Sequence, residues 1–111
     1  MNYREEVEWI LRALERKGVK EFSFTNEYGE KWEGIEDCAY QVCNHEEGWV
    51  RYTDPTLTNR RRAVYFVAGN SLGEIVCDYT VPTDRSIPDE EDIMWQVCEE
   101  YQIWLESEDL V

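Results

Sequence analysis

Apolar residues near the N-terminus recur with the period of an α-helix. One stripe with spacings of four, three and four residues consists of Tyr3, Val7, Ile10 and Leu14. Acidic residues suit the first turn of such a helix, and Gly18 suits its end. The pattern predicts a helix over residues 3–17.

The middle of the chain shows the alternation and the turn residues of an antiparallel sheet. Residues 20–26 alternate, with Phe22 and Phe24 on one face, and a turn over 27–30 leads into a short return strand. Further strands are predicted at 49–53, 62–68 and 74–81. The segment 62–68 is apolar on both faces, which is typical of a central strand.

Residues 35–46 fit two patterns. Ile35, Cys38, Ala39 and Val42 have helical spacing, whereas Cys38, Tyr40 and Val42 would share one face of a strand. The helix is the favoured interpretation, and the strand is the alternative.

The last part of the chain combines a helical apolar pattern with a helix-start signal. Ser86 and Asp89 have the spacing of a capping box, and Pro88 suits a first turn. The pattern predicts a helix from residue 86 to about residue 107. The element order then indicates a single α+β domain over 1–111, with an antiparallel sheet of four to five strands packed by the N-terminal and C-terminal helices. The middle helix or a second copy of the chain would cover the other face of the sheet.

Charge changes this picture, because it is concentrated at one end. The formal net charge is −14, and residues 86–111 contain nine acidic residues but no Lys or Arg. Acids near the C-terminal end of a helix oppose the helix dipole, so helix stability does not explain Glu106, Glu108 and Asp109. A field of this sign repels nucleic acids and anionic membranes and attracts basic surfaces.

A helical projection places carboxylates opposite the apolar stripe of the last helix. Asp92, Glu99 and Glu106 recur every seven residues, about 10.5 Å apart along the axis, and Trp95 and Ile103 fall in the same sector. Charge that steers a partner, together with aromatic or aliphatic anchors, is typical of a binding surface. The predicted partner-binding residues are Asp92, Trp95, Glu99, Glu100, Ile103, Glu106, Glu108 and Asp109. The alternative is that Trp95 and Ile103 pack within the fold.

Motifs for chemistry are weak in this sequence. His45 is the single histidine, and Cys38, Cys43 and His45 lack the second close ligand pair of a zinc site. The segment 69–73 reads as a hairpin turn rather than a phosphate-binding loop, and Arg60, Arg61 and Arg62 read as a solvated strand entry or as partners of the acidic helix. We therefore expect no enzyme activity, no cofactor and no metal.

The favoured function is that of an acidic binding protein. A folded row of carboxylates can replace a phosphate backbone in a basic groove, so we expect an inhibitor that mimics nucleic acid and blocks a basic nucleic-acid-binding effector, as phage proteins of the anti-CRISPR or anti-restriction type do. The alternatives are an immunity or antitoxin-like inhibitor of a basic toxin, or an acidic assembly subunit. Three features indicate a cytoplasmic protein that contacts no membrane: the polar start, the lack of a long apolar run, and four cysteines without a disulfide framework. The sequence leaves open whether the protein forms a homodimer.

Overall fold

The computed structural model describes residues 3–55, 61–67, 74–80 and 88–107. Its elements in chain order are α1 (Tyr3–Arg16), β1 (Lys20–Thr25), β2 (Lys31–Glu33), α2 (Ile35–His45), β3 (Glu47–Thr53), β4 (Arg61–Val67), β5 (Val76–Tyr79), the short 3₁₀ turn η1 (Asp89–Glu91) and α3 (Ile93–Ser107). This is the α+β architecture that the sequence predicts. The helical interpretation of residues 35–46 is also confirmed.

The five strands form one antiparallel sheet in the order β2-β1-β3-β4-β5. The longest ladder joins β3 to β4, from the pair Glu47 and Val67 to the pair Thr53 and Arg61. The central strand is therefore β3. β4 covers most of the segment 62–68, which was predicted to be a central strand, and it lies inside the sheet between β3 and the edge strand β5.

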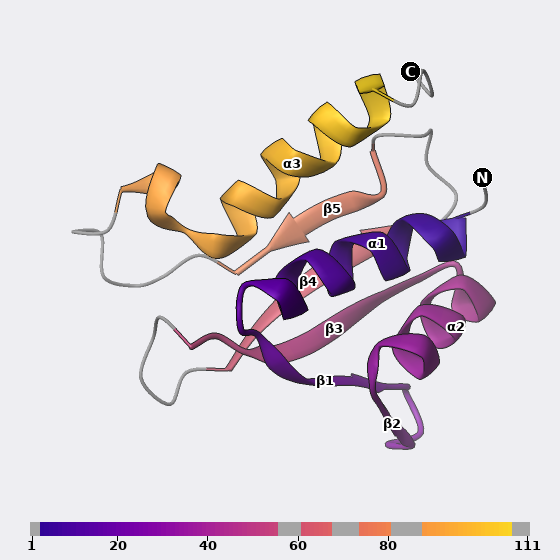
Figure 1. The fold of residues 1–111 in the computed structure, drawn as a ribbon. Coiled ribbons are helices and arrows are strands. Elements are labelled where there is room, and N and C mark those ends of the chain that lie inside the picture. The colour runs from indigo at the N-terminus through magenta and orange to yellow at the C-terminus, as the bar shows by residue number, and fades with distance from the viewer. Residues whose placement is uncertain (1–2, 56–60, 68–73, 81–87, 108–111) are drawn as a thin grey trace.

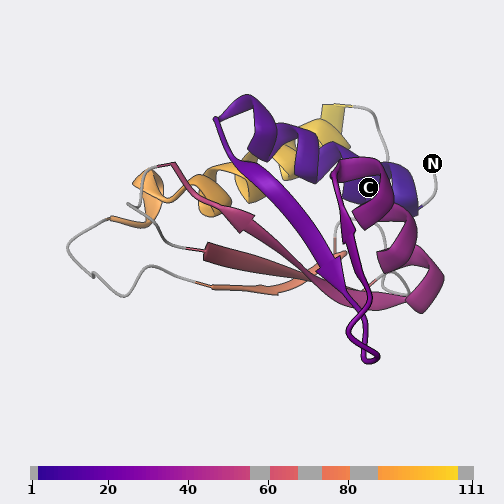
Figure 2. The ribbon, with the colours of Figure 1, turned by 90° about the horizontal axis from the view of Figure 1, so that it is seen from below.

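All three helices lie on the same side of the sheet, as Figures 1 and 2 show. Strand residues on that side are buried against them, among them Phe24, Val50 and Phe66. The middle helix α2 contacts β1, β2 and β3 and also packs on α1. It shares the core with the other helices, so it does not cover the second face of the sheet.

Local backbone signals explain where α1 ends. Gly18 has a φ of 95°, its N–H donates to the Glu15 carbonyl at 2.9 Å, and the Val19 N–H donates to the Leu14 carbonyl at 3.1 Å. This pair of bonds is the Schellman arrangement, which satisfies carbonyls of the last turn. The turn leads directly into β1.

The last helix starts later than the sequence predicts. η1 covers Asp89–Glu91 and α3 begins at Ile93, where the Met94 N–H donates to Asp92 Oδ1 at 3.0 Å. Asp92 is therefore the N-cap. Ser86, which suggested an earlier start, lies outside the described residues.

Candidate partner-binding surface

The exposed side of α3 carries an apolar residue between acids. Ile103 is 64% exposed, Glu99 and Glu106 are exposed, and Trp95 is half-buried. These four residues share one side of the helix because they are spaced four, four and three residues apart. We call them the α3 surface. The alternative that Ile103 packs within the fold is wrong, because most of its side chain faces solvent.

Asp92 does not belong to this surface. It is 7% exposed and accepts hydrogen bonds from Arg62 Nη1 at 2.7 Å and Nη2 at 3.1 Å. The helical projection placed it among the exposed acids, but the helix starts only at Ile93, so the projection does not apply to Asp92. The expectation that Asp92 lies on the exposed acidic face is therefore wrong.

The buried guanidinium of Arg62 connects four segments. It also donates to Asp54 Oδ2 at 2.8 Å and to the Thr80 carbonyl, so it ties β4 to the ends of β3 and β5 and to the start of α3. Burial alone lowers the pKa of Arg62, but the hydrogen bonds to Asp92 and Asp54 outweigh it and raise that pKa above its ordinary value. Arg62 therefore has a structural role and is not part of a solvated basic cluster.

The other predicted acids differ in their surroundings. Glu100 is exposed, but its Oε1 pairs with Lys17 Nζ at 2.8 Å, which links α3 to the end of α1. Glu108 and Asp109 lie outside the described residues. Glu90 and Glu91, which are not among the predicted partner-binding residues, are also exposed just before the helix.

Most cations of the described residues are already paired, which leaves carboxylates in excess at the surface. Ion pairs within 4 Å involve Arg4, Arg12, Lys17, Lys31, Arg61 and Arg62. Apart from the buried pairs of Arg62, these ion pairs are at least partly exposed, and exposed pairs contribute little stability, typically below about 1 kcal/mol each. Their larger effect is on the electric field at the surface, because paired bases do not neutralise other acids. α3 itself contains no base, so the field around it stays negative.

The inner side of α3 is held to α1 by aromatic rings. Trp9 stacks on Trp104 with ring centroids 4.9 Å apart and contacts Tyr101 at 5.8 Å, while the Tyr101 hydroxyl donates to the buried carboxylate of Glu6. Trp9 therefore packs on α3. These contacts hold the backbone of α3 in place while its outer side faces solvent.

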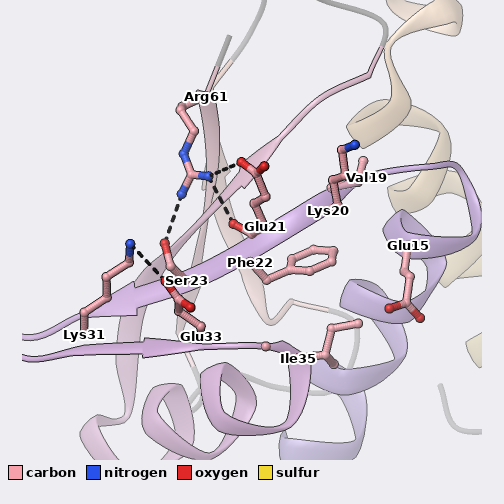
Figure 3. A pocket seen from close by; sticks show the side chains of 11 residues that line it. Glu15, Val19, Lys20, Glu21, Phe22, Ser23, Lys31, Glu33, Ile35 and Arg61 are labelled. Atoms are coloured by element: carbon pink, nitrogen blue, oxygen red, sulfur yellow. Dashed lines mark hydrogen bonds and ion pairs between the residues drawn. The ribbon is translucent and has the colours of Figure 1, made fainter. Parts of the chain in front are cut away.

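A hollow of about 460 Å³ lies where β2 ends beside β1 (Figure 3). Its rim mixes three acids with three bases, and Arg61 donates there to Glu21 at 3.3 Å and to Ser23 at 3.0 Å. Glu21 adopts a φ of 61° at the irregular register between Lys20 and Ser23. Charges that already neutralise one another give this hollow no clear preference for a ligand.

The cysteines and the histidine are dispersed. Burial, with a smaller contribution from Asp37, raises the pKa of the Cys38 thiol to about 12, and burial likewise raises that of Cys98 to about 11. His45 is exposed and stacks on Phe24 at 5.7 Å. Within the described part of the chain, no three His, Cys, Asp or Glu side chains are placed to hold a metal ion.

The sheet face opposite the helices was not recognised from the sequence. Its outward side chains include Trp49 and Tyr65, which are direct cross-strand partners with ring centroids 5.0 Å apart, and the exposed Arg51. No helix of the described residues packs there (Figure 2). The alternation of residues 47–53 would have placed Trp49, Arg51 and Thr53 together. We call this the open sheet face.

Comparison with known proteins identifies no relative: no family, no curated protein and no solved structure matches this chain. Among the described residues, none of the helices has the length and apolar character needed to cross a membrane.

Proposed function

We propose that this protein binds a basic protein through the α3 surface and acts as an inhibitor that mimics nucleic acid. The observation that carries the proposal is Ile103, 64% exposed between two exposed carboxylates on a helix without bases. A large apolar side chain in such a setting supplies contact area, and the acids around it provide steering and register.

Charge supports a nucleic-acid-binding partner in particular. The net charge is −14, and Glu90, Glu91, Glu99 and Glu106 place exposed carboxylates along one helix and the turn before it. A groove lined with Lys and Arg that holds a phosphate backbone would accept such a row. Binding would also release the counterions that screen the acids, just as binding of DNA or RNA to such a groove releases the counterions of the phosphates.

The exposed Ile103 also favours a second candidate, an immunity-type inhibitor of a basic toxin. In that case a few apolar contacts would dominate the affinity, and the spread of charge would matter less. An acidic assembly subunit is the third candidate, and it would bind its partner without displacing nucleic acid.

Two variants separate the first two candidates. A tagged protein is used to capture binding proteins from host lysate, and each captured protein is then titrated with labelled DNA or RNA. For a mimic, the double change Glu99→Lys and Glu106→Lys should weaken binding at least about a hundredfold, whereas Ile103→Ser should have the smaller effect. For a toxin inhibitor the order is reversed, because the apolar contact dominates.

A matched control tests whether net charge alone explains the loss. Glu27→Lys with Asp37→Lys makes the same change in charge at exposed positions away from α3. This variant should retain most of the affinity if the α3 surface makes the contact. Equal losses in both double variants would contradict a localised surface, and a captured protein that keeps its nucleic acid would contradict mimicry.

A further inference from the structure

We infer that the open sheet face is a self-association surface that binds a second copy of this chain. The inference does not depend on the basic partner. It starts from three side chains of β3 and β4 that point away from the helices, the aromatic pair Trp49 and Tyr65 and the cation Arg51. Trp49 is 40% exposed although it lies on the central strand, where aromatic residues are usually covered.

The charges on this face suit a second copy better than a basic or an acidic partner. In the described strands its outward bases are Lys20, Lys31, Arg51 and Arg61, and its outward acids are Glu21, Glu33, Glu47 and Asp78. The face is therefore close to neutral, whereas the whole chain carries −14. Close approach of two such chains therefore meets little local repulsion between the described side chains of this face.

The face also carries both signs in a form that can pair across a two-fold axis. Lys31 pairs with Glu33 and Arg61 with Glu21, each at 3.3 Å, on the same face. Arg51 has no ion-pair partner among the described residues, and neither have Glu47 and Asp78. Glu47 accepts a hydrogen bond from the Tyr65 hydroxyl at 2.6 Å and Asp78 one from the Tyr79 N–H at 2.8 Å, so neither carboxylate is neutralised by a base of the described residues. A two-fold contact repeats every interaction, so Arg51 of each copy can pair with an acid of the other in both directions.

Shape and area allow a contact of modest size. A hollow of about 400 Å³ lies beside Trp49 and is lined also by Tyr28, Arg51 and Tyr65, which offers space for an aromatic side chain of the second copy. Five strands at about 4.8 Å spacing and about 17 Å length cover on the order of 400 Å² per copy, so the contact buries roughly 800 Å² in total. That is below the area of about 1,200–2,000 Å² that stable specific interfaces bury and indicates a weak dimer.

Salt dependence distinguishes this dimer from the complex with a basic partner. Two sheets pack about 10 Å apart, so the two acidic chains repel one another at low ionic strength, when the Debye length is about 30 Å, and much less at 0.15 M, when it is about 8 Å. The dimer should therefore strengthen as salt rises. Binding to a basic partner should instead weaken as salt rises.

Sedimentation equilibrium tests the inference between 1 µM and 1 mM protein. At 0.15 M NaCl the mass should rise with concentration from 13.3 kDa toward twice that value, and at 0.01 M the dissociation constant should be at least about tenfold weaker. Trp49→Ser should weaken the dimer about thirtyfold and Arg51→Glu about tenfold, while the control Ile103→Ser on the helical side should change it less than about twofold.

Two results would overturn the inference. One is a mass of 13.3 kDa at every concentration in both 0.15 M and 0.5 M NaCl. The other is a dimer whose dissociation constant changes with Ile103→Ser but not with Arg51→Glu. Arg51 is exposed, so its variant tests the surface even if Trp49→Ser impairs folding. Loss of the dimer with unchanged binding to a basic partner would leave the proposed function in place.

Discussion

Asp92 offers the sharpest test of how the acidic end of this chain is built. Asp92→Asn keeps the size of the side chain and removes its charge, at a site that is 7% exposed and bonded twice to Arg62, at 2.7 and 3.1 Å. Breaking a buried ion pair by removing one partner costs about 3–5 kcal/mol. The variant protein should therefore unfold more readily.

The magnitude should lie below that range for two structural reasons. Asp54 still accepts a hydrogen bond from Arg62 at 2.8 Å, and the asparagine oxygen can still cap the Met94 N–H. We expect the free energy of unfolding to fall by about 2–3 kcal/mol. For a domain of 111 residues this lowers Tm by about 8–12 °C.

Urea unfolding followed by tryptophan fluorescence and far-UV circular dichroism measures the change. The midpoint should fall with an unchanged m value, because the surface exposed on unfolding stays the same. The control Glu91→Gln removes an exposed acid next to the site and should change stability by less than about 0.5 kcal/mol. If Asp92→Asn changes the free energy of unfolding no more than this control, the assignment of Asp92 to a structural ion pair is refuted.

Three further predictions concern packing, exposure and pH. Gly48→Ala should cost about 1–3 kcal/mol, because the added Cβ would lie 2.3 Å from Cε2 of the Phe24 ring, and thermal unfolding measures the loss. Ile103→Ser should leave the free energy of unfolding within about 0.5 kcal/mol, whereas Leu105→Ala, at a fully buried side chain two residues later, should cost about 2–5 kcal/mol in urea titrations. The pKa of Cys38 rises on folding from 9.0 to about 12, so the unfolded chain loses this proton first as pH rises. The free energy of unfolding should therefore fall by up to about 1.4 kcal/mol per pH unit between pH 9 and 12. Urea unfolding at several pH values measures this slope, which should be shallower for Cys38→Ala.

Local pattern was sufficient for most elements and for part of the candidate surface. The stripe of Tyr3, Val7, Ile10 and Leu14 predicts α1, and all of its members except the exposed Tyr3 are buried. The same reasoning places Glu99, Ile103 and Glu106 together on α3. It fails at Asp92, where the regular helix has not yet begun. A helical projection cannot show at which residue the helix starts. The capping signal at Ser86 indicated a helix start before Ile93.

By itself the sequence determined the class of fold, the order of the elements and the concentration of acidic charge at one end, because these follow from residue spacing and composition. Only the tertiary structure decided that β3 is central, that Asp92 is buried against Arg62, and that all three helices share one side of the sheet. These features depend on contacts between residues distant in the chain. The alternation of a strand shows which side chains share a face, but only the packing of the whole chain decides which face the helices cover.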